Sequence, residues 1–201
     1  GLDGSIEKTC HLPLIMAADI RPAVLTWSGH YLINPFDDSD DGTLRNLKEY
    51  PGLAAYFDKN RAVLMGRHVA KKRSQNWYRT IDRIWPSLQH RPKLLIPDIQ
   101  LQTTIGYDEG HYYPHHNLYW ITSGDWELRA LKTILRSTIV LNQVRAYSVQ
   151  MRGGSIRFQA QTLRRIRVPR LASLPASLQN RLADLAESSD LVEIEGVVGE
   201  A

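Results

Sequence analysis

The chain has 201 residues, of which 43% are hydrophobic and 23% charged, a composition typical of a soluble globular protein. No apolar run approaches the roughly 20 residues of a membrane helix, and the first residues lack the pattern of a secretory signal. The single Cys10 cannot form an internal disulfide, which fits a reducing compartment. We therefore expect a cytoplasmic protein with no membrane partner.

The first half of the chain predicts short strands followed by one helix. Leu12–Ile15 and Tyr31–Ile33 have the length and apolar content of strands, and Asp37–Gly42 is a polar loop. Pro51 suits the first position of a helix. Apolar residues follow it at helical spacing, so we predict a helix over Pro51–Met65 that ends at Gly66.

The second half predicts four further strands, at Lys93–Ile96, Leu101–Ile105, His111–Tyr113 and Leu118–Thr122. Asp108-Glu109-Gly110 is a turn signal, and Ser123 is a candidate cap for a helix that begins near Asp125. A second helix is expected before Gly153-Gly154, and a last amphipathic helix covers Leu174 to Leu185. Strands and helices do not alternate regularly, so we predict an α+β fold of mixed short-strand sheets with amphipathic helices.

Basic residues gather in two acid-poor segments, although the formal net charge is only +4. Between Lys59 and Lys93 the only acid is Asp82, and between Leu128 and Ala183 there is none. This distribution favours a face that binds a polyanion such as nucleic acid. The alternative is an ordinary solvated surface.

The segment Arg67–Arg79 combines cations, aromatic rings and neutral hydrogen-bonding side chains. Lys and Arg suit phosphates, whereas Arg, Asn, Gln and Ser match the edges of bases. Aromatic rings stack on a displaced base or pack inside the protein, and for Trp77 both roles stay open. The candidate contacts are Arg67, His68, Lys71, Lys72, Arg73, Asn76, Trp77, Tyr78 and Arg79.

A second candidate segment is a glycine pair between two arginines. Paired glycines adopt positive φ or let the backbone approach a phosphate closely, and the flanking cations suit phosphate or guanine. The alternative is a simple turn between a helix and a strand. The candidate contacts are Arg152, Gly153, Gly154, Ser155 and Arg157.

The third segment, His111–Asn117, holds three histidines. Zinc sites usually add cysteine or carboxylate ligands at recognisable spacing, and adjacent histidines on a strand would point to opposite sides. We therefore prefer a polar hairpin edge that faces DNA to a metal site. The candidate contacts are Tyr113, His115, His116 and Asn117.

Three blocks, in order, resemble the C-terminal specificity domain of TaqI-like and Eco57I-like adenine-N6 DNA methyltransferases, many of which are type IIG restriction–modification enzymes. They are Leu47–Arg79, Arg91–Thr122 and Leu128–Pro169, the last with SVQMRGGSIRFQAQTLRRIRVP. The resemblance spans roughly residues 12–185. It implies that residues 1–45 connect to this domain and begin it and that 46–189 form the DNA target-recognition domain. The acids at the end of the sequence predict an acidic tail over 190–201.

The resemblance also implies a division of labour. A separate N-terminal methyltransferase domain of the same parent protein would bind S-adenosylmethionine and methylate an adenine flipped out of the duplex. This chain would recognise double-stranded DNA and carry no cofactor, metal or catalytic residue. The nearest match to the family's Asn-Pro-Pro-aromatic motif is Asn34-Pro35-Phe36, which lacks the second proline. Pro97-Asp98 suggests a metal-dependent nuclease, but no acid-x-Lys triplet follows it.

Two other functions stay open at this point. One is a protein–protein interaction module of a restriction or phage-defence complex, in which the charge is incidental. The other is RNA binding, which the lack of an aromatic-rich strand signature disfavours. The sequence does not indicate whether the parent also cleaves DNA.

Overall fold

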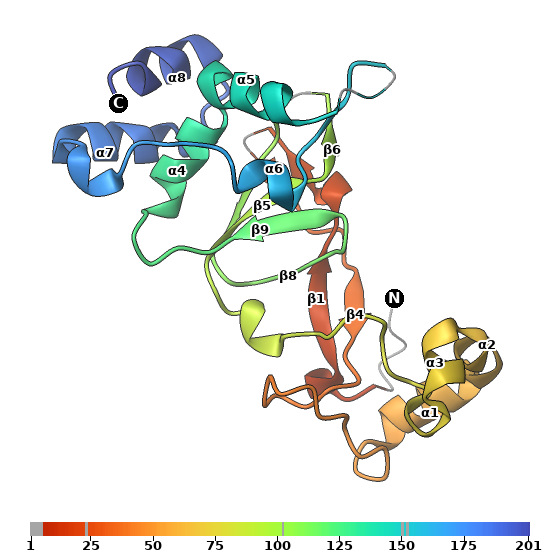
Figure 1. The fold of residues 1–201 in the computed structure, drawn as a ribbon. Coiled ribbons are helices and arrows are strands. Elements are labelled where there is room, and N and C mark those ends of the chain that lie inside the picture. Colours follow the sequence, from red (N-terminus) through yellow and green to blue (C-terminus); the bar gives the residue numbers. More distant parts are fainter. Residues whose placement is uncertain (1–5, 23, 102, 150, 152) are drawn as a thin grey trace. The chain divides into compact units, whose positions relative to one another are not determined.

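The computed structural model describes residues 6–22, 24–101, 103–149, 151 and 153–201. The chain divides into two compact units (Figure 1). The first unit comprises Gly1–Leu14, Gly29–His90 and His111–Tyr113, and the second comprises Ile15–Ser28, Arg91–Gly110 and Pro114–Ala201. Among the described residues, no helix has both the length and the apolar character needed to cross a bilayer.

The first unit is built from a small sheet and a group of helices (Figure 1). The sheet has the strand order β4-β1-β8, and β1 pairs antiparallel with β4 through His11↔Ile33 and Leu12↔Leu32. The strands are β1 (His11–Ile15), β4 (Tyr31–Ile33) and β8 (Tyr113–Pro114), of which the last residues of β1 and β8, Ile15 and Pro114, are assigned to the second unit. The helices are α1 (Pro51–Lys59), α2 (Arg61–Gly66), α3 (His68–Lys72) and the short 3-10 helices Lys8–Cys10, Ser74–Asn76 and Pro86–Leu88.

The helix predicted over Pro51–Met65 is two helices, because Asn60 interrupts it. Its backbone leaves helical geometry at φ −102°, ψ 10°, and its side-chain amide donates to the carbonyl of Tyr56 at 2.8 Å. Asparagine side chains compete in this way with the helical backbone. The start at Pro51 and the end at Gly66 agree with the prediction.

Two apolar clusters stabilise the first unit. One joins α1 to the segment that follows α3, and its buried members are Ile6, Cys10, Leu53, Phe57, Ala70 and Trp77. The other lies against the sheet, and its buried members are Leu12, Phe36, Ile84, Leu88 and Tyr113.

The second unit contains three small sheets. β5 lies between β7 and β9, antiparallel to both, while β2 pairs with β3 and β6 with β10. The prediction of a strand at Leu101–Ile105 is wrong for the residues described there, since Gln102 lies outside them and the strands of this stretch lie before and after it. The strands are β2 (Ile20–Arg21), β3 (Val24–Leu25), β5 (Lys93–Pro97), β6 (Ile99–Gln100), β7 (Gly106–Asp108), β9 (Leu118–Ile121) and β10 (Ile156–Arg157).

Helices pack against the three-stranded sheet of the second unit. α4 contacts β5 and β7, and α7 and α8 contact α4. They are α4 (Leu128–Leu135), α5 (Thr138–Tyr147), α6 (Ala160–Leu163), α7 (Ala176–Asp184) and α8 (Leu191–Val198), with 3-10 helices at Ala17–Asp19, Leu171–Ser173 and Leu185–Glu187. Glu127, and not Ser123, caps α4, because its carboxylate accepts from the N–H groups of Arg129 and Ala130. Ser123 instead accepts from Asp125 and Trp126 and forms a turn.

The segment expected as an acidic tail contains α8. Its Ile194, Val197 and Val198 belong to the core of the second unit together with residues of α4, α5 and α7, and Asp190 caps its N-terminus. The start of the recognition domain at residue 46 stays a prediction. Small sheets and packed helices in both units confirm the predicted α+β class.

Candidate nucleic-acid interface

The basic segment of the first unit forms α3 and the turn after it. His68, Lys71, Lys72 and Arg73 are all exposed, and in the described part of the chain no carboxylate forms an ion pair with any of them. Like charges that are close and uncompensated repel one another and attract a polyanion. This short helix therefore presents concentrated positive charge to solvent.

Arg67, although adjacent to these cations, is bound to the protein backbone. Its guanidinium donates to the carbonyls of Leu64, Trp77 and Arg79 at 3.0 to 3.1 Å. These three bonds connect the end of α2 to the far end of the segment. Arg67 thus holds the segment in shape.

The aromatic pair of this segment packs inside the first unit. Trp77 is 8% exposed, and its ring lies edge-on to Phe57, with centroids 6.2 Å apart. Tyr78 lies 5.4 Å from Phe57 between ring centroids and donates its hydroxyl hydrogen to the carbonyl of Arg45. Of the two roles left open for Trp77, the structure therefore favours packing.

The remaining members of the segment are neither as exposed as the cations of α3 nor as buried as Trp77. Asn76 and Arg79 are half-buried, and the Arg79 guanidinium lies 5.4 Å above the ring of Phe36. Both residues are therefore partly exposed to solvent.

The predicted hairpin edge divides between the two units. Tyr113, in the first unit, is buried and accepts a hydrogen bond from the N–H of Trp85. In the second unit, His115 and His116 lie with ring centroids 4.0 Å apart, so the expectation that they point to opposite sides is wrong. The reason is that they follow β8 in a turn, which is closed by the N–H of Leu118 donating to the carbonyl of His115. Among the described residues no group of three or more His, Cys, Asp or Glu is placed to hold a metal ion.

The glycine pair forms a tight turn in the second unit. Gly153 and Gly154 have φ of 89° and 81°, a region that residues with a Cβ rarely adopt, and the N–H of Met151 donates to the carbonyl of Ser155 across the turn. Arg157 forms an ion pair with Asp98. Arg152 lies outside the described residues. The positive φ expected for the glycines is therefore confirmed, and the Arg157 charge is already partnered.

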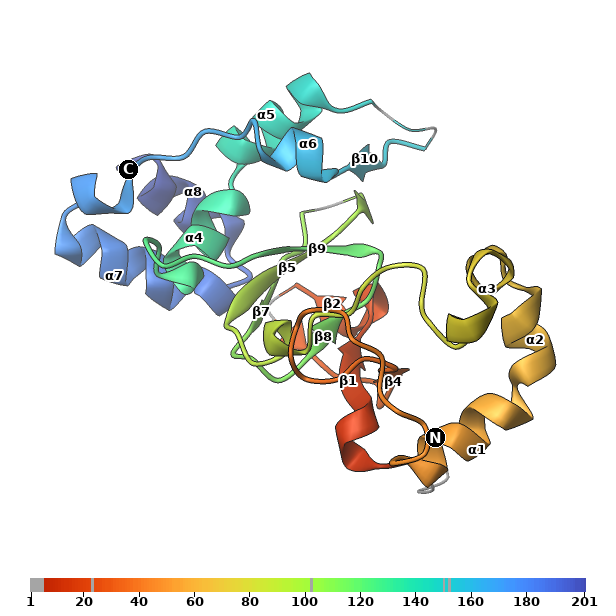
Figure 2. The same ribbon diagram turned by 60° about the horizontal axis from the view of Figure 1, so that its bottom comes forward.

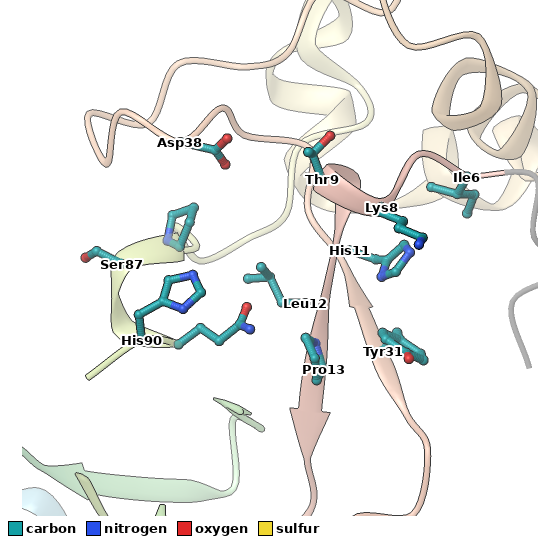
Figure 3. Close-up of a pocket in the computed structure, with 12 residues that line it drawn as sticks. Ile6, Lys8, Thr9, His11, Leu12, Pro13, Tyr31, Asp38, Ser87 and His90 are labelled. Atoms are coloured by element: carbon teal, nitrogen blue, oxygen red, sulfur yellow. The ribbon is translucent and has the colours of Figure 1, made fainter. Parts of the chain in front are cut away.

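A hollow in the first unit was missed by the sequence analysis (Figure 3). It has a volume of about 970 Å³, and the His11 and Tyr31 rings that line it meet edge to face, with centroids 4.7 Å apart. Burial lowers the pKa of His11, and the nearby Lys8 lowers it further. Ser87, Gln89 and His90 also line the hollow. Its lining comes from stretches far apart in the sequence, so no local motif indicated it.

Solved structures with a similar fold include two restriction–modification enzymes. The type IIL enzyme MmeI, solved in complex with DNA, superposes with a TM-score of 0.61 at 14% identity over 96% of this chain and 27% of its own. The type IIG restriction endonuclease BpuSI gives 0.52 at 15% identity, over 99% of this chain and 27% of its own.

Curated relatives are more similar in sequence. The type II methyltransferase M.PaeR7I of Pseudomonas aeruginosa is 50% identical over 186 residues, which are 92% of this chain and 32% of the relative. The type II methyltransferase M.XhoI of Xanthomonas vasicola is 46% identical over 92% of this chain and 34% of the relative. The type II methyltransferase M.BstVI of Geobacillus stearothermophilus is 45% identical over 89% of this chain and 32% of the relative. The chain thus spans about a third of the length of these relatives.

The sequence also matches a described protein family. The match covers residues 12–168, which include α3, the hairpin edge and the glycine turn. The chain belongs to the family of TaqI-like C-terminal specificity domains.

Proposed function

We propose that this chain recognises the target sequence in double-stranded DNA for an adenine-N6 DNA methyltransferase of a restriction–modification system. Membership of the specificity-domain family supports this, as do the curated relatives, which are named type II methyltransferases. The observation that carries the proposal is the group of exposed cations on and after α3, within the matched region, that form no ion pair with any carboxylate of the described residues. An interaction module whose charge is incidental has no need of such a group.

The candidate residues take different parts in this proposal. Lys71, Lys72 and Arg73 contact phosphates, because an exposed cation gains most from a phosphate that releases its counterions. Base edges are contacted by side chains with donors and acceptors, namely His68, Asn76, Arg79, His115, His116 and Asn117. The segment Arg67–Arg79 is held in shape by Arg67, Trp77 and Tyr78, whereas Tyr113 fixes the backbone at Trp85.

The glycine turn contacts the DNA backbone in this proposal. Around Gly153 and Gly154 an added Cβ would meet nothing within 4 Å, so the turn leaves room for a phosphate to approach the backbone closely. Ser155 and Arg157 follow the glycine pair in the sequence and Arg152 precedes it, so that the proposed phosphate contact includes a hydroxyl group and two positive charges. The ion pair with Asp98 sets the orientation of Arg157.

The methyl transfer itself takes place in a separate N-terminal methyltransferase domain of the parent, which is also the proposed partner of this chain. That domain would hold S-adenosylmethionine and receive the adenine after it leaves the duplex. The role of this chain is to fix the position of the duplex, so that one base in one sequence context reaches the methyl donor.

The test begins with a selection from a random duplex library, using the 201-residue chain. The selected duplex and a scrambled one are then titrated by fluorescence anisotropy at several salt concentrations. We expect tighter binding of the selected duplex, and we expect Lys71→Ala/Lys72→Ala to lower the slope of log K against log salt by about 2. Lys8→Ala/Lys48→Ala removes the same charge outside the acid-poor segment and should leave the slope unchanged.

Two results would overturn the proposal. If no duplex is enriched or bound at micromolar protein, the interaction-module alternative replaces it. If the two double variants lower the slope equally, the charge on and after α3 has no special part in binding.

A further inference from the structure

The cations of the second unit include two classes. Several are occupied within the protein by a carboxylate or by backbone carbonyls: Lys93, Lys132, Arg136, Arg157 and Arg181. Several others are exposed, and within the described ranges no carboxylate pairs with them; four of these lie on neighbouring elements, namely Arg145, Arg164, Arg165 and Arg167. All four lie on α5, at the end of α6 or in the segment after it.

Packing holds these elements together as one surface. α5 and α6 lie side by side in both views (Figures 1 and 2), with Val144 and Thr162 buried. The Gln143 amide donates to the carbonyl of Arg167 at 3.0 Å and accepts from its N–H at 2.8 Å. This reciprocal pair fastens the segment after α6 to the face of α5.

One guanidinium on this surface is oriented by an aromatic ring. Arg165 lies over the ring of Tyr147, with 3.9 Å between its central carbon and the ring centroid, and Tyr147 is 41% exposed. Stacking occupies the flat face of a guanidinium and leaves the N–H groups along its edge available. A group held in this way loses little conformational freedom when it binds an oxyanion.

We propose that Arg145, Arg164, Arg165 and Arg167 form a sequence-independent anchor for the phosphodiester backbone of duplex DNA. The inference rests on the proposed function and adds to it a second contact surface. The chemistry of the four groups supports a phosphate ligand, because all four are arginines in a stretch of sequence, from Leu128 to Ala183, that contains no acid. Contacts to phosphates fix the position of a protein on the duplex without discriminating between sequences.

The matched test compares two single variants. Arg165→Ala and Arg181→Ala each remove one exposed arginine, but Arg181 is paired with Glu200 at 2.6 Å and Arg165 with no carboxylate in the described chain. We expect Arg165→Ala to lower the slope of log K against log salt by about 1 and Arg181→Ala to leave it unchanged. Arg165→Lys keeps the charge and should keep the slope.

The triple variant Arg164→Ala/Arg165→Ala/Arg167→Ala separates an anchor from a reader of bases. Affinity for the selected and the scrambled duplex should fall by the same factor, so that their ratio stays constant while the slope falls by about 3. An unchanged melting temperature excludes loss of folding. If the triple alanine variant unfolds, the same three positions are changed to glutamine, which removes the charge and retains more side-chain volume. The affinities for the selected and the scrambled duplex are then compared in the same way.

The outcomes distinguish this inference from the proposed function. Failure of the wild-type chain to bind any duplex overturns both. Normal binding by the triple variant overturns the anchor alone, and so does a change in the ratio between the two duplexes. Tighter binding of a structured RNA than of either duplex also overturns it, because the surface would then serve a different polyanion.

Discussion

Lys93 and Asp108 face each other across β5 and β7 in register, and their side chains form an ion pair of 2.6 Å with both fully buried. Burial lowers the pKa of Lys93, and Asp108 offsets part of that effect. The Lys93 ammonium also donates to the carbonyl of Arg91. Two charges in an otherwise apolar strand region are thus held against each other in the interior of the second unit.

Breaking this pair should destabilise the second unit strongly. Asp108→Asn removes one charge and leaves the other buried, which we expect to lower the free energy of unfolding by about 3–5 kcal/mol. The double variant Lys93→Met/Asp108→Leu removes both charges and should cost much less. Urea unfolding followed by circular dichroism measures both, and equal losses in the two variants would show that the pair itself matters little.

Glu7 should make the first unit sensitive to acid. Burial raises the pKa of Glu7, but hydrogen bonds from its own N–H and from those of Gly52 and Leu53 outweigh this and hold the pKa below its usual value. The stabilisation is therefore complete above about pH 4.5, the ordinary value, and is lost as pH falls through the lowered pKa. At neutral pH we expect Glu7→Gln to cost about 1 kcal/mol.

The pH dependence of the free energy of unfolding tests this role of the Glu7 carboxylate. The free energy of unfolding should fall more steeply below pH 4.5 in the wild type than in Glu7→Gln, because the variant has no proton to take up there. Parallel profiles would show that other carboxylates control the acid sensitivity.

Cys10 should report on the unfolding of the first unit. Its side chain is completely buried, and burial raises the pKa of its thiol, so the reactive thiolate is both scarce and inaccessible. We expect an aromatic disulfide reagent to label it only through opening of the fold, with faster labelling in Glu7→Gln than in the wild type. Rapid labelling at the same rate in both proteins would contradict the buried position.

Two neighbouring cations should respond differently to mutation. Arg67→Ala leaves the carbonyls of Trp77 and Arg79 without their donor, and we expect a loss of about 1–3 kcal/mol in stability. Lys71→Ala removes an exposed side chain and should change stability by less than about 0.5 kcal/mol while weakening DNA binding. Thermal unfolding measures the effect of each variant on stability, and anisotropy measures its effect on DNA binding. If Lys71→Ala instead lowered stability and Arg67→Ala weakened only DNA binding, both assignments would be wrong.

The glycine turn has room for a larger side chain, but its positive φ is unfavourable for any residue that has a Cβ. No atom lies within 4 Å of an added Cβ at Gly153, yet its φ is +89°, so Gly153→Ala should cost about 1–2 kcal/mol. Gly196, in α8, has equal space without a positive φ. Gly196→Ala should therefore stabilise the protein by about 0.5–1 kcal/mol, and a stabilising Gly153→Ala would contradict the described turn.

Local patterns in the sequence were enough to predict most elements. β4 occupies Tyr31–Ile33 as predicted, and the expected starts of α1 and β5 are correct. These features depend on the period of the backbone and on residues such as Pro51, which act within one turn of a helix or one strand. The α+β class follows from the same patterns. The failures at Asn60 and at Leu101–Ile105 are places where side-chain bonds and strand pairing decide the outcome.

The sequence by itself determined where the cations lie along the chain, and only the tertiary structure decided which of them are free. Arg67, Lys71 and Arg157 are indistinguishable in a count of charge. Arg157 meets Asp98, 59 positions away, and Arg67 meets carbonyls beyond α3, whereas Lys71 is exposed without a carboxylate partner in the described chain. Ion pairs and burial form between segments that folding brings together, so no local spacing encodes them.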